Sequence, residues 1–205
     1  MGKIINAISA PVDTKRRGAM ALRLFVSIDV ENPDLVAKIS ELKSLIDSVG
    51  APVKLVEDEN LHVTLAFIGE VPEVLVDRVR NCLARVSRPS FSAHLRGLGA
   101  FPSPQRPRVL WVGIEEGRAE LEELHRAVSR NLISAGVGFR GSSFEPHVTI
   151  GRVKGARNIA VLTKILEQYS DFEVGWLKVS EFRLKRSVLT PRGPIYSTLA
   201  SFPLQ

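Results

Sequence analysis

The chain is poor in cysteine, in histidine and in long apolar runs. Its 205 residues include one cysteine, Cys82, so no disulfide can form within the chain, and Cys82 fits an apolar helical stripe as a core residue. No apolar run approaches the ~18 residues of a membrane-spanning helix, and no stretch has the pattern of a secretory signal peptide. We therefore expect a reduced, cytoplasmic protein that makes no contact with a membrane.

What the chain does contain is ordinary for a globular protein, with 44% hydrophobic and 24% charged residues. The net charge is +6, and residues 1–19 supply half of it through four basic residues and one acidic residue. These residues lack helical or strand periodicity, so we interpret 1–19 as a disordered leader or tag. Residues 20–205 are then a single, mildly basic domain, which is compatible with a polyanionic partner.

Apolar periodicity divides this domain into two similar passes of strands and helices. The first pass predicts a strand at 22–30, a helix at 32–50, strands at 53–56 and 61–68, a helix at 72–86 and a strand at 90–98. The second predicts a strand at 108–116, a helix at 118–135, a strand at 147–153, a helix at 158–169 and closing strands at 172–187 and 194–203.

The equal spacing of the two passes indicates a duplicated unit. Ile28 precedes His62 by 34 residues, and the corresponding isoleucine of the second pass precedes His147 by 33. We predict an α+β fold with two pseudo-symmetric lobes, each a mostly antiparallel sheet with helices on its outer face, around a central cleft. The lobes are formed approximately by 22–100 and 107–203, and an exchange of strands between them is left open.

Two short segments, "LHVTLAFIG" and "PHVTIGRVK", share a His-Val-Thr sequence and contain two of the four histidines. Because side chains alternate along a strand, His62 and Thr64 share one face, and His147 and Thr149 share the matching face of the second segment. The apolar residues between them face the other way and need helices over them. The two polar faces are then left to line the cleft.

Two imidazoles and two hydroxyls in one cleft suit a phosphodiester substrate. An imidazole titrates near pH 6.5, so one ring can take a proton from a nucleophile while the other gives a proton to the departing oxygen. Hydroxyl groups can hold the phosphoryl oxygens. Neither segment has carboxylates at metal-ligand spacing and the chain has no Cys/His cluster, so we expect no metal and no cofactor.

The chain resembles a known family in these segments and around them. The stretches "RLFVSIDV", "ENLHVTLAFIGEV", "LGAFPSPQRPRVLWVGI", "FEPHVTIGRVK" and "YSTLASFPL" resemble the two-histidine (2H) phosphoesterase superfamily, and most closely its RNA 2′,3′-cyclic phosphodiesterases, formerly called 2′-5′ RNA ligases. The resemblance implies hydrolysis of an RNA 2′,3′-cyclic phosphate end to a 2′-phosphate, with ATP-independent 2′-5′ joining as the reverse chemistry. The partner is then such an RNA end, tRNA-derived fragments included.

The resemblance also implies individual roles. His62 is the proton donor to the leaving 3′-oxygen, His147 is the proton acceptor that activates water, and Thr64 and Thr149 hold the phosphate. Arg152 follows the second motif where the family commonly has an arginine, so we expect it to contact the anion. Strict alternation would point Arg152 away from the histidine face, so this contact requires a β-bulge or a side chain that reaches round.

The first strands of the two passes, "LFVSI" and "LWVGI", carry Phe25 and Trp111 at corresponding positions. Both are predicted on the cleft face, where either could stack on a base, an interaction worth ~1–3 kcal/mol. The alternative interpretation is that both are plain core aromatics. His94, predicted to point outward from its strand, and His125, on a charged helix stretch, are interpreted as bystanders.

Two other functions stay open at this point. The chain could be an RNA-end binding or joining module in which hydrolysis is incidental, or a phosphodiesterase that acts on a small cyclic nucleotide metabolite. We expect a monomer, because the internal duplication already builds a two-lobed cleft.

Overall fold

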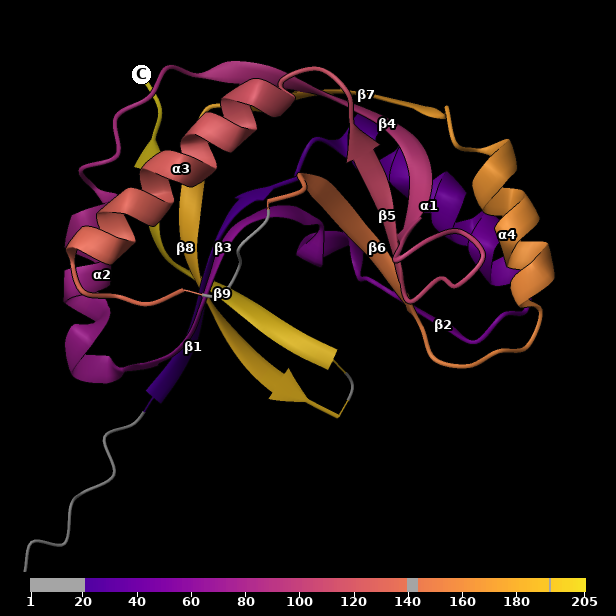
Figure 1. Ribbon diagram of the computed structural model, residues 1–205, viewed down its shortest axis with the longest axis horizontal. Helices are drawn as coiled ribbons and strands as arrows, with labels where there is room; N and C mark the ends of the chain where they lie inside the picture. Colours follow the sequence, from indigo (N-terminus) through magenta and orange to yellow (C-terminus); the bar gives the residue numbers. More distant parts are fainter. Residues whose placement is uncertain (1–20, 140–143, 192) are drawn as a thin grey trace, which may run out of the picture.

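The computed structural model describes residues 21–139, 144–191 and 193–205; the predicted leader at 1–19 lies outside these ranges. The described residues form one curled sheet of nine strands with four α-helices (Figure 1). The strands are β1 (Ala21–Asp29), β2 (Val53–Leu55), β3 (His62–Pro72), β4 (Phe91–Phe101), β5 (Val109–Ile114), β6 (His147–Val153), β7 (Glu173–Val179), β8 (Glu181–Thr190) and β9 (Gly193–Pro203). The helices are α1 (Pro33–Ser48), α2 (Val76–Leu83), α3 (Arg118–Ser134) and α4 (Ile159–Gln168).

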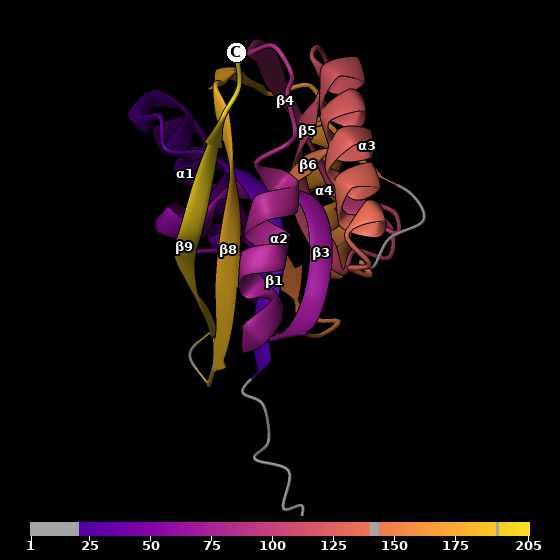
Figure 2. The same ribbon diagram turned by 90° about the vertical axis from the view of Figure 1, so that its left-hand side faces the viewer.

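The sheet runs in the order β7-β4-β5-β6-β3-β1-β8-β9, with β2 paired to β6, and its strand pairs are antiparallel. We call β3, β1, β8 and β9 with α2 and α3 the first lobe, and β6, β5, β4, β7 and β2 with α1 and α4 the second lobe. Figure 2 views the first lobe, where α3 packs on β3 and α2 packs on α3. The predicted α+β fold is confirmed.

The lobes do not coincide with the two halves of the chain. Helix α1 comes from the first half but packs on β7, β2 and β6 of the second lobe, and α3 comes from the second half but packs on β3 of the first lobe. Strand β4 likewise belongs to the second lobe, whereas β8 and β9 belong to the first. The segments 22–100 and 107–203 therefore exchange helices as well as strands.

Local sequence signals explain where α1 begins and ends. The side chain of Asn32 accepts a hydrogen bond from the backbone N–H of Asp34 at 2.9 Å, and Pro33 occupies the first helical position, where no N–H is needed. Gly50 follows the helix with a φ of 66°, a conformation that glycine adopts without strain. The residues of α1 that are buried recur at helical spacing and are Leu35, Ile39, Leu42 and Ile46.

The strand predicted at 172–187 is wrong in one respect, because the structure divides it at Ser180. Its first part is β7, which pairs with β4 at one end of the sheet, and its second part is β8, which pairs with β1 in the other lobe. At the break, the carbonyl of Ser180 accepts a hydrogen bond from the N–H of Leu204. Alternation continues through the break, and a period of two carries no information about which strand is the neighbour.

The apolar sides of the two motif strands form part of the core, as the alternation predicted. Val63, Leu65, Val148 and Ile150 are all buried, on the faces covered by helices. Cys82 is buried as well, and its thiol donates to the carbonyl of Val79. Among the described helices, none is long and apolar enough to cross a membrane.

Candidate active site

The two motif strands, β3 and β6, are neighbours in the sheet and join the lobes. They pair antiparallel at Val63 and Val148, so continuing this register by one residue sets His62 toward Thr149 and Thr64 toward His147. All four motif side chains line one cleft of about 1220 Å³ between the lobes. The structure therefore brings together the four residues that the sequence analysis selected.

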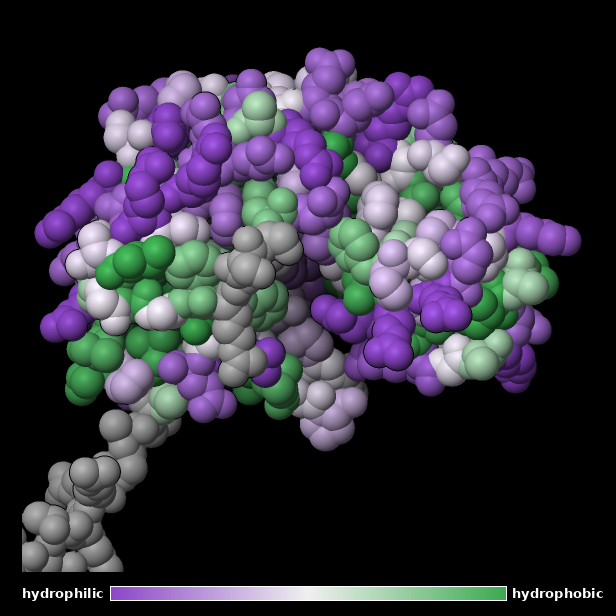
Figure 3. All heavy atoms as spheres, viewed as in Figure 1, coloured by the Kyte–Doolittle hydropathy of each residue, from purple (hydrophilic) through white to green (hydrophobic). Residues whose placement is uncertain are grey.

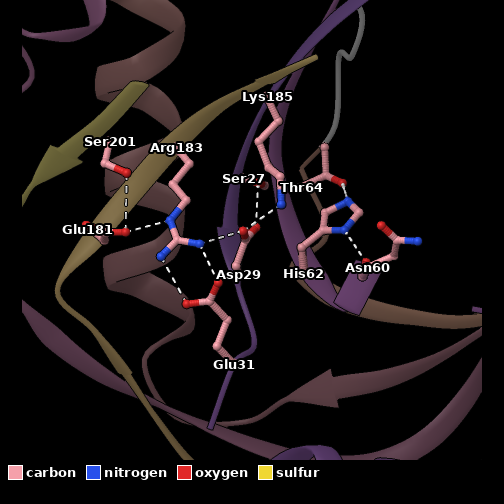
Figure 4. A network of polar contacts seen from close by, with 10 residues as sticks. All are labelled: Ser27, Asp29, Glu31, Asn60, His62, Thr64, Glu181, Arg183, Lys185 and Ser201. Carbon is pink, nitrogen blue, oxygen red and sulfur yellow. Dashed lines mark hydrogen bonds and ion pairs between the residues drawn. The ribbon is translucent and has the colours of Figure 1, made fainter. Parts of the chain in front are cut away.

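The same backbone contact orients both imidazoles. His62 Nδ1 lies 2.7 Å from the carbonyl oxygen of Asn60, and His147 Nδ1 lies 2.7 Å from that of Glu145, in each case two residues earlier. A carbonyl can only accept, so Nδ1 carries the hydrogen and Nε2 is left for chemistry. His62 Nε2 contacts the Thr64 hydroxyl at 3.0 Å (Figure 4). Each ring can therefore accept or give a proton at Nε2.

Burial is the largest cause that lowers the pKa of both His62 and His147 below the ordinary value near 6.5. At His62, the Asn60 carbonyl and the Asp29 carboxylate oppose burial without cancelling it; at His147, the carbonyl and carboxylate of Glu145 do the same. Both rings thus favour the neutral form. An anionic substrate would favour protonation of one of them, because an opposite charge stabilises the imidazolium.

Aromatic rings surround His62 on two sides. The ring of Phe25 lies 5.3 Å from that of His62, and the ring of Tyr196, on β9, meets it edge-on at 5.5 Å. Phe25 is 1% exposed and therefore has no free face for a base, so the prediction that Phe25 stacks on the substrate is wrong. Tyr196 lines the cleft and was not selected from the sequence, although the stretch "YSTLASFPL" contains it.

A β-bulge brings Arg152 into the cleft. Two consecutive residues of β5 pair with Thr149 and with Gly151, so Ile150 is an extra residue of β6 at this point. The extra residue shifts the alternation, and Arg152 lines the same cleft as His147. The β-bulge that the prediction for Arg152 required is therefore present in the structure. The contact of Arg152 with a phosphate stays a prediction.

Strand β3 has the corresponding bulge after its own motif. Consecutive residues of β1 pair with Thr64 and Ala66, which makes Leu65 the extra residue. Five residues after His62, where the second motif has Arg152, β3 has Phe67, which is 39% exposed and lines the cleft. The two motifs thus share their backbone geometry but place an aromatic ring and a guanidinium at equivalent positions.

Strand pairing also shows that Phe25 and Trp111 are not structural equivalents. Trp111 pairs with Thr149, and the residue that pairs with Thr64 is Ser27. The correspondence inferred from the sequence was therefore wrong by two residues. A shift of two residues keeps every side chain on the same face of the strand, so alternation could not reveal it. Trp111 is half-buried with its indole lying across Gly99, and its role in base stacking stays a prediction.

His125, interpreted as a bystander, lies in the cleft. Its Nδ1 donates a hydrogen bond to the carbonyl of Leu65 at 2.7 Å, beyond the point where β3 pairs with β6. Its ring stacks on Phe144 at 4.3 Å with an interplanar angle of 2°. Both side chains line the cleft. The prediction for His125 was wrong, although its position four residues after the buried Leu121 was a signal that it faces the sheet.

His94 points outward, as predicted, on the same face as the exposed Trp176, but it is covered there rather than exposed to solvent. It is 7% exposed, its Nε2 lies 2.6 Å from a carboxylate oxygen of Glu173, and its ring stacks on Trp176 at 4.7 Å. It lies on β4, apart from the residues that line the cleft. No group of three or more metal-ligating side chains occurs within the described ranges.

The LigT-like phosphoesterase family matches this chain twice, over residues 28–111 and again over residues 112–196, so that each match contains one motif. The chain belongs to this family of two-histidine phosphoesterases, as the motifs predicted. The double match agrees with the duplication inferred from the spacing of the two passes.

Curated relatives within the family carry a more specific name. An RNA 2′,3′-cyclic phosphodiesterase of Aeropyrum pernix is 48% identical over 165 residues, which cover 80% of this chain and 94% of the relative. A protein of the same name from Archaeoglobus fulgidus is 40% identical over 181 residues, which cover 88% of this chain and 99% of the relative.

Solved structures have the same bilobal fold. The apo form of Escherichia coli LigT matches with a TM-score of 0.73 at 25% identity, covering 90% of this chain and 98% of that one. The protein TT0787 of Thermus thermophilus matches with a TM-score of 0.69 at 29% identity, covering 89% and 97%. Another crystal structure of E. coli LigT, with a TM-score of 0.72, contains 3′-AMP.

Proposed function

We propose that this protein hydrolyses the 2′,3′-cyclic phosphate at the end of an RNA to a 2′-phosphomonoester. The observation that carries the proposal is the pair of imidazoles, held by the same carbonyl contact and lining one cleft with two threonine hydroxyls. The names of the curated relatives support the substrate class. General acid–base catalysis by two such groups typically contributes ~10²- to 10⁴-fold per group.

In the proposed reaction His147 Nε2 takes a proton from water, and the water oxygen forms a bond to phosphorus. The bond between phosphorus and the 3′-oxygen breaks, and that oxygen receives the proton of His62 Nε2. Thr64, Thr149 and Arg152 hold the non-bridging oxygens, so that the developing charge meets fixed donors. Solvent then returns His62 to its protonated form and His147 to its neutral form. With an RNA 5′-hydroxyl in place of the attacking water, the same groups form a 2′-5′ linkage.

The walls of the cleft differ in a way that suits RNA. On the second-lobe side the lining includes three basic residues, Lys54, Arg152 and Lys154, beside the acidic Glu57 and Glu59. The three cations suit the phosphates of the RNA chain. On the first-lobe side it includes Phe67 and the stacked pair of His125 and Phe144, and Figure 3 shows hydrophobic side chains gathered on this lobe below α3. We assign base stacking to this aromatic wall in place of Phe25, with Trp111 kept as a second candidate.

One chain supplies both motifs and both walls, so the proposed enzyme works as a monomer. The test is product analysis of an oligonucleotide with a 2′,3′-cyclic phosphate end, incubated with the protein in EDTA. The expected product is the 2′-phosphate, formed at the same rate with and without EDTA, because side chains supply both proton transfers. A 3′-phosphate product, or no turnover, would contradict the proposal.

A mononucleotide comparison separates RNA from a small metabolite as the substrate. The aromatic and basic walls extend beyond the four motif residues, so we expect kcat/KM to be higher for the oligonucleotide than for a nucleoside 2′,3′-cyclic phosphate. Equal kcat/KM values for the two substrates would indicate that the enzyme acts on a small cyclic nucleotide rather than on RNA. Binding of RNA ends without hydrolysis would identify a binding module, with strong salt dependence as its signature.

A further inference from the structure

A buried ion pair lies behind His62 and takes no part in the proton transfers described above. Asp29 ends β1 directly across from His62 in the strand register, and opposite residues of antiparallel strands project on the same face, with Cβ atoms ~4.5–5.5 Å apart. Its carboxylate lies 2.6 Å from the ammonium of Lys185, which β8 contributes from the same side (Figure 4).

The fold keeps the Asp29 carboxylate ionised. Burial by itself would raise the pKa of Asp29, but the hydrogen bond and charge of Lys185, with further hydrogen bonds from Ser27 at 3.0 Å and Arg183 at 2.9 Å, outweigh burial and lower it. The side chains of Asp29 and Lys185 are each 7% exposed. Buried ion pairs stabilise a fold weakly or not at all compared with apolar residues of similar size, so stability alone is a poor reason for this pair.

The second lobe lacks the pair, although its strands are arranged in the same way. Gly113 pairs with His147 where Asp29 pairs with His62. Lys185 pairs with the residue four positions before Asp29, and Phe101 pairs with the residue four positions before Gly113, so Phe101 is the equivalent of Lys185. The ring of Phe101 meets that of His147 edge-on at 5.0 Å. The fold therefore puts a buried carboxylate across the strand from His62 and an aromatic ring beside His147, where the carboxylate that acts on the ring is that of the exposed Glu145.

We propose that the Asp29 carboxylate, held ionised by Lys185 and Arg183, stabilises the protonated form of His62 and thereby makes His62, rather than His147, the proton donor. Asp29 acts through His62 and is a positioning residue. The inference rests on the proposed function, because it explains how two imidazoles with the same backbone contact divide the roles of acid and base.

The other charged or titratable groups around His62 must be included in any pH argument. Those that face its ring or act on it are Asp29 from β1, Lys185 from β8, His147 from β6 and Tyr196 from β9. Arg183 contacts Asp29 and is itself bound by Glu31 and Glu181, which are more exposed. Removing Asp29 leaves Lys185 facing His62 uncompensated, whereas removing Lys185 leaves Asp29 with Arg183 as its remaining cationic partner.

The test is the alkaline inflection of the kcat/KM profile, which reports loss of the proton from the acid. In Asp29→Asn we expect this inflection to move to lower pH, in Lys185→Met to higher pH, and in the double variant to return toward the wild-type position. Lys178→Met, which removes an exposed lysine from β7, is the control and leaves the inflection in place. If the ion pair were purely structural, the alkaline inflection would move in the same direction in both single variants or would not move in either. That result would overturn the inference.

A second measurement uses the unaltered protein, in case a single variant does not fold. Histidine ring signals are followed by NMR against pH in the presence of inorganic phosphate, with His62→Gln to assign the signal. The His62 ring is expected to protonate at higher pH than the His147 ring; equal or reversed order would refute the role of Asp29. Failure of the proposed function is a separate result, namely no hydrolysis of the cyclic phosphate by the wild-type protein, and it leaves this order measurable.

Discussion

The two halves of the cleft are alike in backbone and different in surroundings. Each motif strand holds its histidine through the carbonyl two residues earlier and bulges at the residue after its threonine. Around His62 lie two aromatic rings and a buried ion pair, whereas around His147 lie Phe101 and two exposed charges, Glu145 and Arg152. The duplicated part sets the tautomer and direction of each ring, and the part that differs can set which ring carries the proton.

The same contrast extends to the free edges of the motif strands. The carbonyl of Ile150 in β6 accepts from the backbone N–H of Val56, just after β2, at 2.9 Å. The carbonyl of Leu65 in β3 accepts from the side chain of His125 instead. A buried carbonyl needs a partner, and the two lobes meet the same need with a strand in one case and a helix side chain in the other, which is how an imidazole of α3 comes to line the cleft.

The largest expected effect follows from removing either imidazole. His62→Ala and His147→Ala are each expected to lower kcat by ~10²- to 10⁴-fold, and the double variant by less than the product of the two, because acid and base act in one step. Steady-state kinetics on a cyclic-phosphate oligonucleotide measures this. His94→Gln, away from the cleft, is the control. A variant of either motif histidine that keeps near-normal kcat would break the acid–base comparison.

The next effect tests the aromatic ring and the guanidinium at equivalent places. Arg152→Met is expected to lower kcat/KM ~10²-fold for mononucleotide and oligonucleotide alike, because it removes a charged donor to the phosphate. Phe67→Ala is expected to raise KM about tenfold, consistent with ~1–3 kcal/mol of stacking, and to leave kcat nearly unchanged. Val74→Ala, at an 82% exposed position, is the matched control. Equal effects of both variants on kcat would show that the walls do not divide base from phosphate.

Stability is expected to depend on pH through the two rings. Burial lowers the pKa of both in the folded protein, so the unfolded chain binds protons more readily, and the free energy of unfolding falls as pH decreases through ~6.5. The urea midpoint is therefore expected to be lower at pH 5.5 than at pH 7.5. His62→Gln and His147→Gln are each expected to reduce that difference, because each removes one ring whose pKa burial lowers. A midpoint that does not change with pH would contradict the effect of burial.

The smallest predicted effect concerns the packing of the Trp111 indole against Gly99. A Cβ added at Gly99 would lie 2.2 Å from the indole ring, so Gly99→Ala is expected to cost ~1–3 kcal/mol through overpacking. Gly138→Ala, where an added Cβ has no described atom within 4 Å, is the matched control and is expected to be nearly neutral. Thermal unfolding of both variants measures the difference, and equal melting temperatures would show that the indole moves aside freely.

Much of this molecule could be predicted from the sequence because its signals are local. Alternation along β3 and β6 identified the faces of the two motifs, and Asn32, Pro33 and Gly50 identified the ends of α1. The four motif residues were recognisable because the pattern occurs twice. The family resemblance added Arg152, which alternation alone would have pointed away from the cleft.

The rest depends on contacts that have no local signal. Phe25 was assigned to the cleft surface because it shares the face of His62, but a face does not show what covers it, and here Tyr196 comes from the far end of the chain. The bulges that redirect Arg152 and Phe67 depend on pairing with β5 and β1. His125 was misjudged because its function in the fold is to bind a carbonyl of another element.

The exchange of helices between the lobes has a consequence for how such a molecule could be taken apart. A fragment ending in the loop after β4 would carry α1 without the β6 and β7 strands that it covers, and the complementary fragment would carry α3 without β3. Each fragment would lack strands that its own helix covers. When the two fragments associate, each would supply a helix to the sheet of the other, as in a domain-swapped dimer, and both lobes would form. Separately purified fragments would be expected to regain structure only when mixed.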